Sequence, residues 1–421
     1  MLPTDQIISA LVDSLRQNTV PITSRCQADC FFCSNKFNPP GVSVYSFDFT
    51  VEILKQYFQL LSSDSPIIIG ESATRICEGE PLLHPDLKKI LSSLRELYPE
   101  TPIKLTTNGV LLDRDWLDFF IKIKPFELTV SVNSIGRHYE FMKCELLLPL
   151  PFITEFLSSN SVPLNISLVY FRQFETDLFR DLESLKKLPA QLWRILKPGR
   201  SKLADFNADW PEKSFYKKLD PFREDRLILL EPPELSDLEA RVLGFTRVFK
   251  SGLLKAGDVI LEVSGIPVKS RYEAFLTLTS LKDPTIRFQR NGQLYEMTIR
   301  KERKEKSGLV FEHDIHPDDW NSVSGILASN FRIVSAPLPA SFLKSIFPEK
   351  RELIISCPNT VFGGNICVAG LMTLQDLTKL GLSGKYYLPS VMFNNLGFDL
   401  TGQTIKSGGF DVRHKAFYLE L

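Results

Sequence analysis

Three cysteines near the start of the chain, Cys26, Cys30 and Cys33, have the type and spacing of metal ligands. They follow a short extended run over residues 20–23 and read Cys-Gln-Ala-Asp-Cys-Phe-Phe-Cys. Three thiolates, rather than four, would hold an iron–sulfur cluster and leave one iron open to a ligand. A zinc knuckle and three unrelated core cysteines are the alternatives, but zinc prefers a fourth cysteine or histidine close by, and the next cysteine is Cys77.

A second motif, Glu78-Gly79-Glu80-Pro81, follows a predicted strand and precedes Leu82-Leu83. By itself it would be explained as the turn before a helix, with Gly79 at the bend and Glu80 in solvent. Together with the cysteine spacing and Phe32 before the last cysteine, it resembles the signature of radical S-adenosylmethionine (SAM) enzymes. Many members of that superfamily carry Gly-Gly-Glu-Pro followed by Leu-Leu here, and this chain has Glu78 where the first glycine is usual.

The resemblance implies both a cofactor and a reaction. Cys26, Cys30 and Cys33 would bind a [4Fe-4S] cluster whose fourth iron is chelated by the amino and carboxylate groups of SAM. The turn from Glu78 to Pro81 would contact the SAM amino group, mainly through its backbone. An electron donor such as a ferredoxin or flavodoxin would reduce the cluster, and a 5′-deoxyadenosyl radical would remove hydrogen from a substrate.

Further candidate residues stand at the ends of two predicted strands. Thr107 and Asn108 end one strand in a Thr-Asn-Gly turn, which many family members share. Ser131 and Asn133 end the next strand, where the family often contacts the SAM ribose or carboxylate. Polar strand ends are also common in barrels without such a role. The same holds for Arg194, which belongs either to a cofactor site or to a solvated rim.

Between these motifs, strands and helices alternate in a way that predicts an α/β fold. Strands are expected over residues 67–77, 103–107, 127–132, 164–169 and 192–196, and helices over the apolar repeats at 54–61 and 87–94. Such alternation implies parallel strands joined by right-handed crossovers. We therefore expect residues 1–225 to form a partial (β/α)6 TIM-like barrel, with its site at the C-terminal ends of the strands.

The pattern changes near residue 225 to short alternating strands, and residues 228–305 resemble a small β-rich PDZ-like domain. The resemblance lies in Ser251 to Val268 and in the two-residue hairpin signal Asn291-Gly292. Such domains bind a peptide or protein chain end as an added strand, and Leu243-Gly244-Phe245 would be the carboxylate-binding loop. Alternatively, the module braces the barrel, and its groove is filled from within the chain.

Residues 306–421 resemble a conserved C-terminal domain of unknown function, with a mixed α/β character. An uncharacterised family combines this region with a radical SAM core and a PDZ-like domain, usually with the PDZ-like domain first. Here the cysteines come first, so the domain order is rearranged. A substrate therefore cannot be carried over from that family.

Composition narrows the partners and the location. The 421 residues carry 50 basic and 50 acidic side chains, so there is no overall charge to attract nucleic acid or a membrane surface. Seven cysteines, an odd number, without a signal peptide predict a reducing, cytoplasmic environment. No apolar run approaches the roughly twenty residues that span a bilayer.

The favoured function is thus a radical SAM enzyme that acts on an unidentified substrate, either a peptide, a protein or a cofactor precursor. The alternative is an iron–sulfur electron-transfer or scaffold protein with a peptide-binding PDZ-like module. A pure interaction module would leave the clustered cysteines unexplained. The catalytic residues, the product and the oligomeric state do not follow from the sequence.

Overall fold

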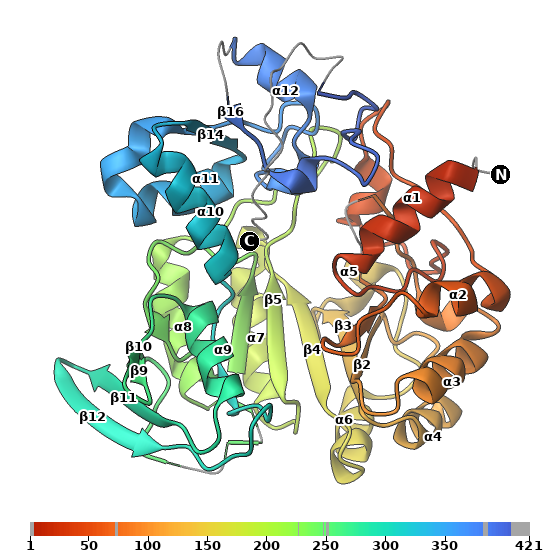
Figure 1. Cartoon of the computed structure of the whole chain (residues 1–421). Helices are drawn as coiled ribbons and strands as arrows, with labels where there is room; N and C mark the ends of the chain where they lie inside the picture. The colour runs from red at the N-terminus through yellow and green to blue at the C-terminus, as the bar shows by residue number, and fades with distance from the viewer. Residues whose placement is uncertain are drawn as a thin grey trace. The chain divides into compact units, whose positions relative to one another are not determined.

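The computed structural model describes residues 4–71, 75–225, 227–246, 248–249, 252–381 and 386–405. The chain divides into two compact units (Figure 1). Unit 1 consists of residues 1–210 together with two segments from the C-terminal part of the chain, 362–365 and 393–403. Unit 2 holds residues 211–361, 366–392 and 404–421.

Unit 1 is built on a parallel sheet whose strands follow the order of the chain. They are β1 (Ile67–Ile69), β2 (Ile103–Thr107), β3 (Phe126–Asn133), β4 (Leu164–Val169) and β5 (Leu192–Leu196). Each strand pairs in parallel with the next. This confirms the predicted α/β fold with a parallel sheet. The first strand is shorter than the predicted range of 67–77, of which residues 72–74 lie outside the described residues.

Helices precede or connect these strands, as the alternation predicted. They are α1 (Thr4–Leu15), α2 (Val51–Phe58), α3 (Leu87–Leu97), α4 (Arg114–Lys122), α5 (His138–Met142), α6 (Leu150–Ser159) and α7 (Glu175–Leu185). Short 3-10 helices η1 (Ser34–Phe37), η2 (Pro81–Leu83) and η3 (Arg172–Phe174) lie between them. In α2 and α3 the apolar repeats found in the sequence form the buried side of each helix, which confirms those two helices.

The two faces of the sheet differ in chemistry. On β5, Trp193 and Ile195 are fully buried, whereas Arg194 between them is half-buried. On β2, Leu105 is buried and its neighbours Lys104 and Thr106 are half-buried. Because successive side chains of a strand point to opposite faces, one face is apolar and the other polar. We call the apolar side the outer face and the polar side the inner face.

An ion pair shows how strongly the sheet curves. Arg194 on β5 binds Glu71, which follows β1, with Nη1 to Oε1 as the shorter contact and Nη2 at 3.4 Å from Oε2. Strands β2, β3 and β4 lie between them in the sheet. Four strand spacings of about 4.8 Å amount to roughly 19 Å along the sheet. A direct contact over that separation requires the sheet to bend into a barrel wall with this pair inside it.

Unit 2 begins with α8 (Lys213–Asp225) and β6 (Leu227–Glu231), followed by a small, mainly antiparallel sheet. Its members are β7 (Ala240–Arg241), β9 (Val259–Val263), β10 (Ile266–Pro267), β11 (Thr285–Arg290) and β12 (Gln293–Thr298), with α9 (Arg271–Ser280) between β10 and β11. Asn291 and Gly292 join β11 to β12 with φ angles of 49° and 81°. The predicted two-residue hairpin is thus confirmed, with both residues in the left-handed region that a type I′ turn requires.

The suggested carboxylate-binding loop is already paired inside unit 2. Strand β8 (Gly244–Phe245) runs antiparallel to β13 (Leu309–Val310). The N–H of Leu243 donates to the carbonyl of Val310, and that of Thr246 donates to Gly308, both at 2.8 Å. These amides are therefore not free for a peptide carboxylate, and the pairing favours the alternative that the chain fills this edge itself.

The rest of unit 2 contains a three-stranded parallel sheet with helices. The elements are α10 (Pro317–Ala328), β14 (Arg332–Ser335), α11 (Pro337–Ile346), η4 (Pro348–Leu353), β15 (Ile354–Ser356), η5 (Ala369–Leu371), α12 (Leu374–Lys379), β16 (Tyr386–Tyr387) and η6 (Ser390–Met392). Strand β14 pairs in parallel with β15 and β16. This region contains both helices and strands, and its core includes Val323, Ile333 and Phe342.

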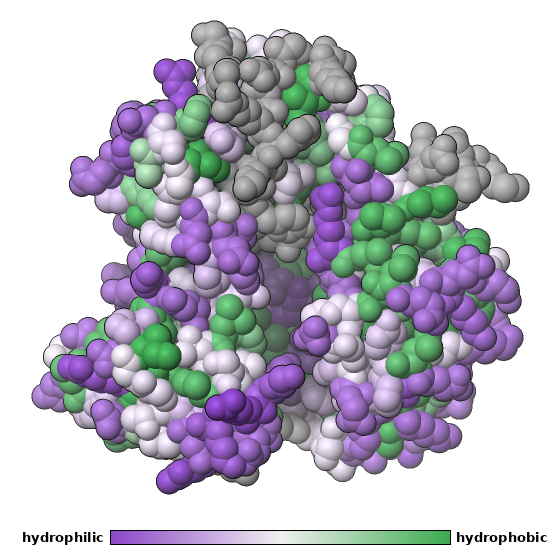
Figure 2. All heavy atoms as spheres, in the orientation of Figure 1, coloured by the Kyte–Doolittle hydropathy of each residue, from purple (hydrophilic) through white to green (hydrophobic). Residues whose placement is uncertain are grey.

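On the surface of unit 1 that Figure 2 shows, apolar side chains gather over α1, whereas polar ones prevail over α2. Ile8 of α1 is among the exposed large apolar residues. Among the described residues, no helix has both the length and the apolar character needed to cross a membrane.

Candidate functional site

The loop that carries Cys26, Cys30 and Cys33 is fixed to the end of α5. The N–H of Asp29 donates to the carbonyl of Met142 at 2.9 Å, and the N–H of Phe31 donates to that of Phe141 at 3.2 Å. Lys36 pairs with Asp29 and also donates to the carbonyl of Cys30 at 2.9 Å. These contacts hold the cysteine loop beside β3, the strand that leads to α5.

Phenylalanine side chains from distant parts of unit 1 surround the same loop. Phe31 lies at its centre, with ring centroids 5.1 to 5.8 Å from those of four other rings: Phe32, Phe141, Phe171 and Phe206. Cys30 and Cys144 also pack against this group. The loop therefore has an apolar wall on one side, which limits the access of water to the thiols.

The three thiols lie near one another. Cys30 is half-buried, and its burial, followed by repulsion from Cys33, Cys26 and Cys144, raises the pKa of its thiol to about 12. No three His, Cys, Asp or Glu side chains within the described ranges converge tightly enough to hold a single metal ion. In an iron–sulfur cluster the cysteines bind different irons. Thiolates are the ligands that such a cluster takes.

The turn from Glu78 to Pro81 packs against the residues that lead into Cys26. The N–H of Gly79 donates to the carbonyl of Thr23 at 2.8 Å, and the N–H of Glu80 donates to that of Arg25 at 2.7 Å. A Cβ at Gly79 would lie 2.1 Å from the Arg25 carbonyl oxygen. Only glycine fits here. The structure thereby brings together the two motifs that the sequence places about fifty residues apart.

Glu80 ties this turn to the Thr-Asn-Gly turn after β2. One carboxylate oxygen accepts from the Leu82 N–H at 3.1 Å and from the Thr107 hydroxyl at 2.6 Å, and the other accepts from the Asn108 N–H at 2.7 Å. Burial raises the pKa of Glu80, although these three donors favour its charged form. Its carboxylate positions neighbouring residues and has few lone pairs left for a ligand.

Asn108 extends from this arrangement to the cysteine loop. Its Nδ2 lies 3.7 Å from the Cys26 sulfur, and its Oδ1 accepts from the Gln27 side chain at 3.2 Å. Thr107 lies next to Asn108 in the chain, and its hydroxyl donates to Glu80. Both residues predicted from the sequence therefore lie at the site, and Asn108 contacts the cysteine loop directly.

Glu78, where the family usually has glycine, is buried. Its Oε1 accepts from the Ile22 N–H at 3.4 Å, and its Oε2 accepts no hydrogen bond from the described residues. Burial raises the pKa of this carboxyl well above its ordinary value. Its backbone carbonyl instead accepts from the Asn35 side chain at 3.1 Å, in the 3-10 helix after Cys33.

Pro81 and the predicted residues of β3 have different surroundings. Pro81 begins η2, and a Cβ at Gly70 would lie 2.8 Å from its ring. Asn133 has a φ of 61°, and its side chain contacts the sulfur of Met142 at 3.0 Å. It therefore supports the anchor of the cysteine loop. Ser131 lies opposite Ser167 on β4, at a half-buried position of the inner face.

Several residues at the site carry no signal in the sequence. Asn35, Gln27 and Phe206 belong to no motif, and their roles follow only from contacts between distant segments. Arg194 lies in the middle of β5 and Glu71 follows β1, and nothing in the sequence pairs them.

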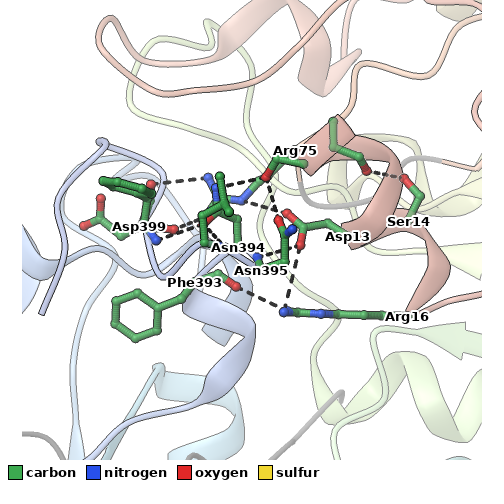
Figure 3. Close-up of polar contacts among 12 residues, drawn as sticks. Asp13, Ser14, Arg16, Arg75, Phe393, Asn394, Asn395 and Asp399 are labelled. Carbon is green, nitrogen blue, oxygen red and sulfur yellow. Dashed lines mark hydrogen bonds and ion pairs between the residues drawn. The ribbon is translucent and has the colours of Figure 1, made fainter. Parts of the chain in front are cut away.

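The segment 393–403 contacts Arg75 and the end of α1 (Figure 3). The buried Arg75 side chain donates to the carbonyls of Phe398 and Asp399 at 2.8 and 3.3 Å, and its Nε lies 3.5 Å from Asp13. Asp13 in turn accepts from the Asn395 N–H at 3.1 Å. The C-terminal part of the chain thus fixes the residues just before Glu78.

Comparison with known proteins matches the region that contains this site. The profile of the radical SAM superfamily matches residues 20–143. GTP 3',8-cyclase of Aquifex aeolicus is 30% identical over 135 residues, which cover 31% of this chain and 39% of that protein. The enzyme of the same name from Staphylococcus saprophyticus is 34% identical over 117 residues, 26% of this chain and 32% of that protein. The match thus spans about two fifths or less of these relatives.

Solved structures give more distant likenesses. Streptococcus suis SuiB bound to precursor peptide SuiA has a TM-score of 0.39 and 13% identity, covering 54% of this chain and 53% of that one. The protein anSMEcpe with bound AdoMet has a TM-score of 0.39 and 16% identity, covering 51% and 62%. These scores are too low to establish a shared fold.

The part of the chain that matches the radical SAM superfamily, residues 20–143, holds the cysteine loop and the glycine-containing turn packed against it. The curated relatives of this region are named as enzymes. Residues 20–143 are therefore similar to the radical SAM superfamily, a class of enzymes that uses SAM and an iron–sulfur cluster.

Proposed function

We propose that this protein binds a [4Fe-4S] cluster through Cys26, Cys30 and Cys33 and reductively cleaves SAM to act on a substrate not yet identified. The classes of substrate proposed are a peptide, a protein and a cofactor precursor. The whole relatives share too little of their length with this chain to give its substrate.

The main support for this proposal is that the turn at Gly79 packs closely against residues 23–25, which lead to Cys26. A turn that served only to start a helix would need no contact with the cysteine loop. Here the backbone of residues 78–80 lies against residues 23–25 so closely that no Cβ fits at Gly79. Asn108, at the end of the neighbouring strand β2, adds a contact between its side-chain amide and the Cys26 sulfur.

The residues have distinct proposed roles. When bound, the cluster and SAM supply a radical that removes hydrogen from the substrate. Gly79 leaves the backbone of the turn accessible to the SAM amino group, and Glu80 holds Asn108 in position beside Cys26. The phenylalanines around Phe31 exclude water from one side of the loop. Ser131 faces the interior of the barrel and is assigned to SAM contact, with Asn133 supporting the loop.

The test is anaerobic reconstitution of the full chain with iron and sulfide, reduction with dithionite, and assay of 5′-deoxyadenosine with and without SAM. The wild-type protein is expected to form it only when SAM is present. Cys30→Ala is expected to lose both the cluster and the product. Cys367→Ala serves as the matched control, since this cysteine belongs to unit 2. A Cys30→Ala protein with full iron content would overturn the ligand assignment.

One observation keeps the electron-transfer or scaffold function as a second candidate. Burial, then the nearby Cys26, raises the pKa of the Cys144 thiol to about 11, and Cys144 packs beside Cys30. A fourth thiolate on the cluster would leave no open iron for SAM. In that case the spectrum of the reduced cluster would not change when SAM is added, and Cys144→Ala would restore the change.

Further parts of the proposal concern domains, partners and location. The radical SAM barrel occupies residues 1–225, the PDZ-like domain 228–305 and the C-terminal domain 306–421, in a rearranged relative of the uncharacterised family. A ferredoxin or flavodoxin would reduce the cluster in the cytoplasm, where thiols stay reduced. Because Leu243 and Thr246 already donate within the chain, a peptide at the PDZ-like domain would have to displace residues 308–310.

A further inference from the structure

The inner face of the barrel sheet carries polar side chains in register. Thr106 on β2 lies opposite Thr129, which lies opposite Asn165, while Ser131 lies opposite Ser167 and Ser167 opposite Arg194. Lys104 and Glu127 form a further opposed pair, with their charged atoms 3.3 Å apart. The closed barrels of this architecture are usually filled by branched apolar side chains. This interior is built instead to meet polar groups.

Among these polar groups, Arg194 is the best suited to bind an anion. Its guanidinium holds Glu71 with two nitrogens, the fork geometry that recognises carboxylates and phosphates. Glu71 also accepts from the Thr106 hydroxyl at 3.0 Å. Burial disfavours the Glu71 carboxylate, but Arg194 and Thr106 more than offset it, so the pKa of Glu71 lies below its ordinary value. The pair is therefore charged on both sides at neutral pH.

The pair is also accessible and close to the proposed SAM site. The Glu71 side chain is 38% exposed and that of Arg194 is 18% exposed, so solvent reaches both. Gly70, next to Glu71, packs against Pro81 of the motif turn. The pair therefore lies on the inner face in contact with solvent, and the residue before Glu71 touches the motif turn.

We propose that Arg194 is the anchor for an oxyanion of the substrate, a phosphate or a carboxylate, and that this group replaces Glu71 on the guanidinium. This inference rests on the proposed function, since it assigns part of the substrate site in the same barrel. Glu71 acts as an internal competitor: it keeps the fork of Arg194 in place and is displaced by the ligand. Thr106 and Lys104 stand near enough to Glu71 and to the inner face to receive it.

The arrangement predicts opposite effects from the two halves of the pair. Removing the guanidinium in Arg194→Met takes away the anchor, so the oxyanion should bind about tenfold or more weakly. Removing the charge of the competitor in Glu71→Gln frees the anchor while keeping its size, so binding should tighten severalfold. Arg194→Lys keeps the charge but loses the fork, and its affinity should fall between wild type and Arg194→Met.

The test is calorimetric titration of the reconstituted full-length chain without reductant, so that no SAM is cleaved. GTP is the phosphate probe, N-acetylglycine the carboxylate probe, and SAM a separate ligand. Binding of one probe identifies the source of the oxyanion. Arg114→Met is the matched control, because Arg114 lies exposed on α4 and pairs with Asp118. It should bind the probes as the wild type does.

The results of these titrations either support or overturn the role of Arg194 as the anchor. Opposite shifts in Glu71→Gln and Arg194→Met support the anchor, and Arg194→Lys provides the same test if Arg194→Met does not fold. The proposal fails if Glu71→Gln binds neither probe at millimolar concentration, or if both variants shift in the same direction. It also fails if Arg194→Met loses affinity for SAM as much as for the probe, since Arg194 would then belong to the SAM site. The proposed function is judged separately, by formation of 5′-deoxyadenosine in the wild type.

Discussion

Trp193 and Arg194 are neighbours on β5, yet they belong to opposite kinds of surface. Trp193 is fully buried on the outer face, with no exposed side-chain area. Arg194 faces the barrel interior and is half-buried. It pairs with the carboxylate of Glu71, which follows β1, four strands away in the sheet. The same alternation holds for Leu105 and Thr106 on β2. Stability and recognition are thus assigned to alternate residues of the same strands.

The two buried acids of the motif turn depart from this division. Glu78 and Glu80 are buried, like the side chains of the outer face, yet they are polar, like those of the inner face. Glu80 meets three donors, whereas one Glu78 oxygen has none among the described residues. Because buried polar groups without partners destabilise a fold, such groups persist where function needs them. The turn thus holds one carboxylate with three partners beside one with an unpaired oxygen among the described residues.

The largest expected effect separates the two faces directly. Trp193→Ala should lower the free energy of unfolding by about 3 to 5 kcal/mol, because it empties a large volume in the outer-face core. Arg194→Met, one residue further, should lower it by about 1 kcal/mol or less, since the pair is open to solvent. Urea unfolding followed by circular dichroism measures both. Equal losses would mean that both faces serve stability alone.

Glu80→Gln should have the next largest effect, about 1 to 3 kcal/mol of unfolding free energy. The amide group would face one of the three donors that now bind the carboxylate, and the Asn108 turn would lose its anchor. Urea unfolding measures the loss, and cluster loading after reconstitution reports the displacement of Asn108. Glu183→Gln on α7 is the control, because Glu183 is exposed and pairs with the nearby Lys186. An unchanged stability would show that the fold does not depend on the charge or on the second acceptor oxygen of Glu80.

The sequence predicted the parts of this site that lie in motifs. The three cysteines, the Glu78 to Pro81 turn and the Thr107-Asn108 strand end all lie at the C-terminal edge of the sheet, because parallel strands end there together. The order of the strands followed from the alternation of strand and helix. Each of these inferences depends on residues close together in the sequence or on a general rule of the fold.

Other features depend on contacts that no local pattern contains. The bond from Glu80 to Thr107 and Asn108, the phenylalanines around Phe31, and the binding of residues 393–403 at Arg75 join segments far apart in the chain. The Arg194–Glu71 pair depends on the curvature of the sheet, which the strand lengths do not specify. The PDZ-like groove was open to two interpretations, and only the pairing of β8 with β13 favours one.

Glu78 gives a prediction that depends on pH. Its pKa is raised by burial, so above its ordinary value of 4.5 the folded protein holds a proton that the unfolded chain releases. Stability should therefore fall as pH rises from that value toward the raised pKa, by up to about 1.4 kcal/mol per pH unit. Glu78→Gln carries a neutral side chain at every pH and should lose this part of the slope.

Urea unfolding of the protein without cluster, from pH 5 to pH 8, measures the difference. The two proteins should be nearly equal in stability at the acid end, and the variant should become the more stable one as pH rises. Glu80 contributes a slope of the same sign, since its pKa is also raised, and this slope remains in both proteins. Parallel profiles would mean that Glu78 is ionised in the fold.

The smallest change in unfolding free energy is expected at Lys104. It gives the most direct comparison of the inner face with the outer face. Lys104 pairs with Glu127 on the inner face, its side chain is 41% exposed, and Glu127 also accepts from the Asn165 amide at 2.6 Å. Lys104→Met should therefore change the unfolding free energy by about 0.5 kcal/mol or less, and 1 M salt should remove most of that difference. Leu105→Ala, the next residue on the same strand, should cost about 2 to 5 kcal/mol in the same measurement. A Lys104→Met variant as damaging as Leu105→Ala would show that the inner face is a structural core, and the ligand site proposed there would lose its physical basis.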